Sequence, residues 1–198
     1  MNRQKKTIRM TTASLLIALI VLLGLTPLGF INVGVIYITF LCVPVILGAQ
    51  AMGLKMGLIL GLSMGCVSFY TGYTKPSALG LPILENSVLW LFPLCFVPRL
   101  LVPFVTDLIK KNMLKKRYAE KDALVMSAGA GSLTNTVFYL GFLLIIYYLI
   151  GLGNGSILTT VIVIALTAGL PEAVAAAIIC PAIYAALKKA RLISRLNT

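Results

Sequence analysis

The sequence predicts an all-α fold, a polytopic membrane protein whose six transmembrane helices form a single domain over residues 1–198. Hydrophobic residues make up 60% of the 198 residues and charged residues 11%, and the mean hydropathy is +1.02. In an ordinary soluble domain about a quarter of the residues are charged. Since a spanning helix needs about 20 apolar residues, the chain accommodates roughly five to seven spans.

Six apolar segments follow one another, at about residues 9–27, 33–51, 54–72, 87–109, 123–150 and 157–187. None alternates in polarity over about ten residues as a β-barrel strand would. The first follows basic residues, like a signal peptide, but it lacks a small-x-small cleavage site, so we interpret it as a retained helix. The last two are long, yet neither contains a charged turn, so we interpret each as one span. Glycine, proline and polar residues predict turns at 26–29, 52–53, 71–76 and 151–155.

The basic residues predict how the helices are oriented. All 17 Lys and Arg residues except Lys75 and Arg99 lie at the two chain ends, at Lys55 after the second segment, or between the fourth and fifth segments. These places share one side of a six-span bundle, and the positive-inside rule makes that side cytoplasmic, with both termini inside. The net charge of +12 thus follows from topology and favours contact with a lipid bilayer, anionic lipid included, over nucleic acid.

Three polar residues stand near the middle of apolar segments: Arg99, Asn135 and Glu172. A charged side chain at the centre of a span costs about 2.5–3.5 kcal/mol, so such residues usually face a bundle interior or a wet cavity. Two interpretations of Arg99 stay open: a salt bridge to Glu172 that ties two helices together, or an anchor for the carboxylate of a ligand. Asn135 suits an amide or hydroxyl group of a ligand, or a bond to another helix.

Neighbours of these residues extend the candidate site. Tyr139 follows Asn135 by one helical turn and is expected on the same face, as a second contact. Glu172 comes just after Pro171 and Gly169, which predicts a locally broken helix whose backbone lines a cavity, or else a packing kink.

Small residues recur at helical spacing in two places. Ser14 and Ala18 form a small-xxx-small pair in the first segment, suited to packing within the chain or to docking of another membrane subunit. In the third segment glycine recurs every four residues, which predicts one face for close helix packing. These glycines are Gly53, Gly57, Gly61 and Gly65.

Signs of catalytic, metal or cofactor chemistry are weak. The sequence has no histidine, and its four cysteines lie inside apolar segments without CxxC spacing. It also lacks a phosphate-binding loop followed by Lys and Ser or Thr. We therefore expect no metal, no cofactor and no catalytic residue, although a small intramembrane enzyme with Glu172 as base, or a structural membrane subunit, stay as alternatives.

Several stretches resemble the substrate-binding S components of energy-coupling factor (ECF) vitamin transporters over nearly the whole chain. They are TPLGFINVGVIYITFLCVPVILGA from Thr26, MGLKMGLILGLSMG from Met52, VPRLLVPFV from Val97, GSLTNTVFYLG from Gly131 and GLPEAVAAAI from Gly169. The combination of Pro-Arg-Leu-Leu, Leu-Thr-Asn-Thr and Pro-Glu-Ala is most similar to the pantothenate-specific members.

The resemblance implies a subunit of the bacterial plasma membrane that is not an enzyme. It would capture pantothenate, or another small vitamin or precursor, at the outer face for ATP-driven uptake with a membrane scaffold subunit and two ATPase subunits. Arg99 and Asn135 would contact pantothenate, with Tyr139 and Glu172 completing the expected substrate-binding set. Ser14 and Ala18 would lie at the docking surface, where the family usually has Ala-x-x-x-Ala and Ser14 keeps the first position small.

Overall fold

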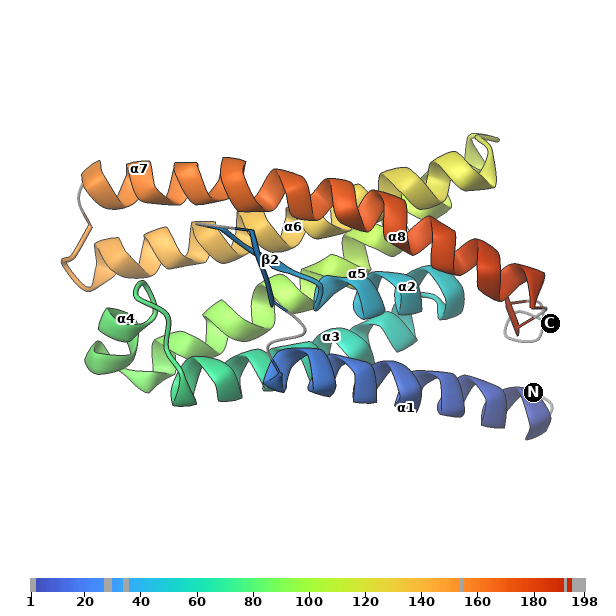
Figure 1. Ribbon diagram of the computed structural model, residues 1–198, viewed down its shortest axis with the longest axis horizontal. Coiled ribbons are helices and arrows are strands. Elements are labelled where there is room, and N and C mark those ends of the chain that lie inside the picture. The colour runs from blue at the N-terminus through green and yellow to red at the C-terminus, as the bar shows by residue number, and fades with distance from the viewer. Residues whose placement is uncertain (1–2, 27–29, 34–35, 154, 191, 194–198) are drawn as a thin grey trace.

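Long helices lie side by side along one axis (Figure 1). The computed structural model describes residues 3–26, 30–33, 36–153, 155–190 and 192–193. Within this part, 5 helices are long and apolar enough to cross a membrane, and the prediction of a helical membrane bundle is confirmed. They are α1 (Arg3–Leu25), α3 (Leu54–Thr74), α5 (Leu91–Lys115) with the preceding 3-10 turn η2 (Val88–Trp90), α6 (Glu120–Leu149), and α7 (Gly155–Ile164) continued by α8 (Leu170–Lys189).

The predicted second span, 33–51, is wrong in its first half. The chain forms an antiparallel pair of strands there, β1 (Phe30–Val33) and β2 (Ile36–Thr39), with Ile31 opposite Ile38. The helix α2 begins only at Cys42 and ends at Met52. Because apolar β-branched residues suit a pleated strand as well as a buried helix, hydropathy alone could not separate the two. With 11 residues, α2 is about 16 Å long, roughly half the hydrocarbon thickness.

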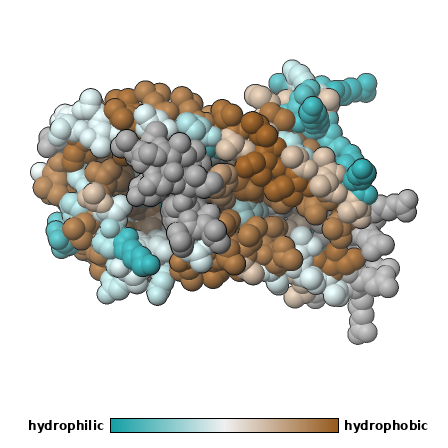
Figure 2. All heavy atoms as spheres, viewed as in Figure 1, coloured by the Kyte–Doolittle hydropathy of each residue, from teal (hydrophilic) through white to brown (hydrophobic). Residues whose placement is uncertain are grey.

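The two ends of the bundle differ in polarity. The start of α1, the end of α8 and the turns after α2 and α5 lie at one end, and the short helix α4 (Leu81–Asn86) lies at the other (Figure 1). Hydrophobic residues cover much of the middle of the molecule, and hydrophilic residues gather where α5 and α6 meet (Figure 2). We call the end where α5 and α6 meet the inner end, and the end with α4 the outer end.

Three of the four glycines predicted to share a packing face bring α3 against α5. A Cβ at Gly61 would lie 2.5 Å from the carbonyl oxygen of Arg99, one at Gly57 2.8 Å from Pro103, and one at Gly65 2.8 Å from Phe96. Only glycine permits this approach, so the packing interpretation is confirmed for these three. Gly53 differs, because its φ of 82° places it in the turn between α2 and α3, where a Cβ would meet nothing within 4 Å.

Polar side chains fix the inner end of the short helix α2. Buried Gln50 donates hydrogen bonds to the carbonyl of Leu124 at 2.9 Å and to the hydroxyl of Ser127 at 3.0 Å. The last carbonyls of α2 accept from cations, that of Gln50 from Lys110 and that of Met52 from Arg9 at 2.8 Å. Cations at a helix C-terminus donate hydrogen bonds to carbonyls that lack a partner within the helix, and they interact favourably with the helix dipole. The helix α2 is thus held between α1, α5 and α6.

A π-helical stretch, η3 (Ala165–Gly169), joins α7 to α8. The predicted break before Glu172 is therefore a widened turn within one continuous helix. Pro171 has no N–H for an α-helical bond, and a π-turn absorbs such a defect without separating the two halves. Gly169 lets this stretch approach α6, where a Cβ would lie 2.5 Å from Thr136.

Candidate binding site

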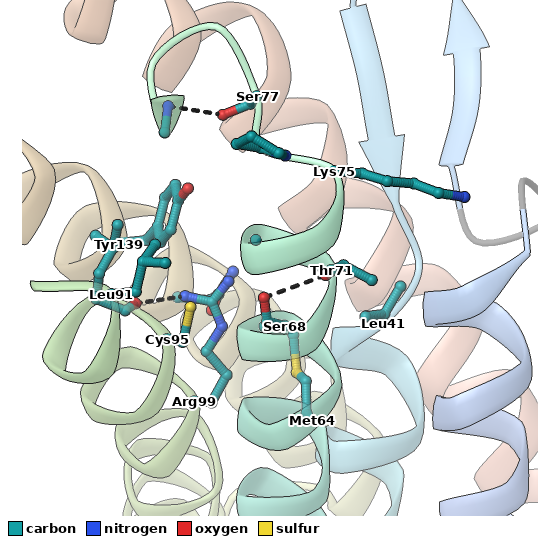
Figure 3. Close-up of a pocket in the computed structure, with 15 residues that line it drawn as sticks. Leu41, Met64, Ser68, Thr71, Lys75, Ser77, Leu91, Cys95, Arg99 and Tyr139 are labelled. Atoms are coloured by element: carbon teal, nitrogen blue, oxygen red, sulfur yellow. Dashed lines mark hydrogen bonds between the residues drawn. The ribbon is translucent and has the colours of Figure 1, made fainter. Parts of the chain in front are cut away.

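A cavity of about 240 Å³ opens between α3, α5 and α6 in the outer half of the bundle. Exposed Ser77 and Lys75 stand at its rim, on the segment that connects α3 to α4, and Leu41 faces it from the start of α2. Its apolar wall includes Met64, Leu91 and Leu94. Its polar side chains come from three helices and are Ser68, Thr71, Arg99, Asn135 and Tyr139 (Figure 3).

Arg99 is oriented by its own helix. Its Nη1 donates a hydrogen bond to the carbonyl of Leu94 at 2.9 Å. In a regular helix this carbonyl would accept from the residue four positions later, which is Pro98 and has no N–H. Figure 3 shows the guanidinium turned toward Tyr139, and its central carbon lies 4.7 Å from the centroid of that ring. A guanidinium over an aromatic face is attracted by the ring quadrupole.

Two buried polar atoms in this cavity have no hydrogen-bond partner among the described residues. They are Nε of Arg99 and Oδ1 of Asn135, and the third such atom in the same part of the chain is Oε1 of Gln50 at the inner end. Asn135 is only 9% exposed. An unsatisfied buried polar group costs about 1–3 kcal/mol. A molecule with a negative acceptor and a nearby donor would satisfy both Arg99 and Asn135, which makes this cavity suited to a small polar anion.

The structure brings together three of the four predicted substrate-binding residues. Arg99, Asn135 and Tyr139 line the same cavity, whereas Glu172 is not among the described residues that line it. Among the described residues Arg99 contacts the carbonyl of Leu94 and the ring of Tyr139, and no ion pair between described side chains joins it to Glu172. The geometry therefore favours the ligand anchor over the interhelical salt bridge, and a substrate contact for Glu172 stays a prediction.

Sequence reasoning missed Ser68 and Thr71, which face the cavity from the outer turns of α3. The spacing of small residues indicates the face on which Ser68 lies, although not Thr71. Residues 61, 65, 68 and 72 follow one helix face at spacings of three and four, so the glycine face that packs on α5 continues outward into the cavity wall. Gly72 lines the cavity as well.

The predicted docking pair lies on the outside of α1. Ser14 and Ala18 are exposed, while Ala13, Leu16 and Ile20 on the other face are buried in the core. The pair is thus not used for packing within the described chain, which leaves it accessible to another membrane protein.

A helical membrane bundle with a cavity that combines an oriented cation and buried polar atoms defines a membrane protein that binds a small molecule. Comparison with known families agrees: the model described as "ECF transporter, substrate-specific component" matches residues 8–184. The chain therefore belongs to the substrate-specific component family of ECF transporters. No curated protein matches the sequence.

Membership gives the general role of the protein. A substrate-specific component is a multi-pass membrane protein that captures a small vitamin substrate and works with scaffold and ATPase subunits. The family is one of transporter components, not of enzymes. The resemblance noted in the sequence is confirmed at this level.

Proposed function

We propose that the protein is a pantothenate-specific S component. The observation that carries the proposal is a pair of buried atoms in one cavity, Nε of Arg99 and Oδ1 of Asn135, that have no hydrogen-bond partner among the described residues. Pantothenate has a carboxylate at one end and an amide and hydroxyls along its length. Its carboxylate is the acceptor that a guanidinium prefers, and its amide or hydroxyl hydrogens suit the oxygen of Asn135.

The cavity walls also match the rest of the molecule. The geminal methyl groups of pantothenate need an apolar surface, and Met64, Leu91 and Leu94 supply one. A volume of about 240 Å³ suits a small vitamin better than a large cofactor. Tyr139 has a further role in the proposal, since the face of its ring packs against the guanidinium of Arg99.

We also propose that both termini are cytoplasmic. The cavity lies in the outer half of the bundle, and the basic residues gather at the other end. By the positive-inside rule the basic end faces the cytoplasm, so the cavity would take up its substrate from outside. Delivery would then require the scaffold subunit, docked on the α1 face that carries Ser14 and Ala18, and two ATPase subunits.

A thermal-shift screen of the purified protein tests the substrate. A ligand that binds only the folded state stabilises it by mass action, by about 2.7 kcal/mol at 100 times its Kd. We expect pantothenate to raise Tm and riboflavin, thiamine, biotin and nicotinate to leave it unchanged at equal concentration. A shift with one of the other vitamins and none with pantothenate would reassign the substrate within the family.

A further inference from the structure

Lys75 is an isolated cation at the outer end of the molecule. Apart from Arg99, every other basic residue of the sequence lies in the stretches assigned to the inner end. Lys75 directly follows α3, where its own N–H bonds to the carbonyl of Thr71 at 2.8 Å, and its side chain is exposed. In Figure 3 this side chain points away from Arg99, outward from the rim of the cavity.

A second hollow meets the cavity at this residue. A groove of about 650 Å³ runs between the outer ends of α1 and α3, and its described lining includes Leu25, Tyr70 and Thr74. Thr71 and Lys75 line both the groove and the cavity. A molecule that moves from the groove into the cavity therefore passes Lys75.

On the opposite side of the cavity rim, the segment that follows Lys75 packs against the bundle and is hydrogen-bonded to it. The hydroxyl of Tyr147 on α6 donates to the carbonyl of Leu79 at 2.9 Å. The carbonyl of Ser77 accepts from the amides of Gly80 and Leu81, both at 2.9 Å, and Ile83 in α4 is fully buried. The segment after Lys75 is thus held against α6, whereas the groove between α1 and α3 meets the cavity at Lys75.

We propose that Lys75 steers the anionic substrate into the cavity, where Arg99 binds it. This inference rests on the proposed function, since it requires a substrate with a carboxylate. An exposed charge adds little to equilibrium affinity because water screens it. Its field still extends over about one Debye length, roughly 10 Å at 0.1 M salt, and a charge at the rim of a site acts mainly on the association rate. Lys75 thus sets how fast the substrate arrives, and Arg99 sets how long it stays.

Lys75 also has a plain structural role to be separated from steering, because a cation at a helix C-terminus stabilises the helix dipole. The two roles differ in what they change. Steering changes the association rate of charged ligands and depends on salt. A structural role changes stability and affects charged and uncharged ligands alike.

The test measures the association of radiolabelled pantothenate, and of its uncharged alcohol pantothenol, with the full chain in phosphatidylcholine nanodiscs. Lys75→Gln is compared with wild type and with Lys55→Gln, which removes an exposed charge from the inner end of the same helix. Rates are taken at about 10 mM and about 1 M salt, where the Debye length is about 30 Å and about 3 Å.

We expect Lys75→Gln to slow pantothenate association about three- to tenfold at low salt. The difference should vanish at high salt, and the dissociation rate, the pantothenol rates and the Lys55→Gln protein should be unchanged. Equal association rates in wild type and Lys75→Gln, or equal slowing of both ligands, would overturn steering while leaving pantothenate binding intact. If wild type binds pantothenate no better than pantothenol, or binds neither, both the proposed function and the steering role of Lys75 are overturned.

Discussion

Arg99 donates a hydrogen bond to the main-chain carbonyl of Leu94, 2.9 Å away and five residues earlier in the same helix. The carbonyl is available because Pro98, its expected helical partner, has no N–H. The bond occupies one end of the guanidinium and leaves Nε buried without a partner among the described residues. A proline in α5 thereby orients the cation of the site.

Pro98→Ala is expected to weaken pantothenate binding without destabilising the protein. The new amide would bond to Leu94 and compete with Arg99, and a neutral hydrogen bond is worth about 0.5–1.5 kcal/mol. We therefore predict a Kd about two- to tenfold higher by isothermal titration, with Tm unchanged or raised because proline is costly inside a helix. Pro181→Ala, at a partly buried proline inside α8, is the control for removing a proline from a helix. If Pro98→Ala binds as tightly as wild type, the proline does not orient Arg99.

Gly61→Ala should damage both folding and binding. The added Cβ would lie 2.5 Å from the carbonyl oxygen of Arg99, which is main chain and cannot turn aside. Overpacking of this kind costs about 1–3 kcal/mol, so Tm should fall and pantothenate binding should weaken. Gly141→Ala is the control, because a Cβ there meets nothing within 4 Å and helix propensity favours alanine. Equal Tm values for the two variants would contradict the close packing of α3 on α5.

Asn135→Ala should weaken pantothenate and pantothenol by the same factor, about tenfold for a loss near 1.4 kcal/mol. The reason is that Asn135 is assigned to the amide or hydroxyl groups, which the two ligands share. Thr134→Ala is the neighbouring control, since this hydroxyl bonds to the carbonyl of Ala130 on its own helix. An Asn135→Ala protein that loses affinity for pantothenate alone would assign the residue to the carboxylate instead.

Ser14→Trp and Ala18→Trp should reduce uptake at least about tenfold when the protein is assembled with its scaffold and ATPase subunits. A large side chain prevents the close backbone approach that small residues allow. Binding by the isolated protein should not change, because both residues lie on the outside of α1. Ile178→Trp, at a position 66% exposed on α8, controls for a bulky group in the lipid. Normal uptake by both α1 variants would move the docking surface elsewhere.

Hydropathy predicted the long helices well because each carries a predominantly apolar run over a spanning length. It failed at Ile36–Thr39, where β-branched residues pair as a strand instead of extending α2. Arg99, Asn135 and Tyr139 were predictable because a polar residue inside an apolar span needs an interior environment. Ser68 and Thr71 were not distinguished, since hydroxyls that bond within their own helix, as Thr71 does with Val67, are common in spans.

The orientation of Arg99 could not be predicted from sequence alone. Both Glu172 and a ligand carboxylate were plausible partners by residue type, and the choice depends on where α8 lies relative to α5. Glu172 is not among the described residues that line the cavity. The bond from Arg99 to Leu94 shows that this partly buried cation is held in place by its own helix.

The central claim is that Arg99 binds the substrate carboxylate. Its most direct test is the Kd of pantothenate and of pantothenol for wild type and for Arg99→Gln. A charged hydrogen bond is worth about 1.5–3 kcal/mol, so wild type should bind pantothenate at least about tenfold more tightly than pantothenol. Arg99→Gln should bind the two ligands equally, at the affinity of wild type for pantothenol. An Arg99→Gln protein that binds pantothenate as tightly as wild type would contradict the account.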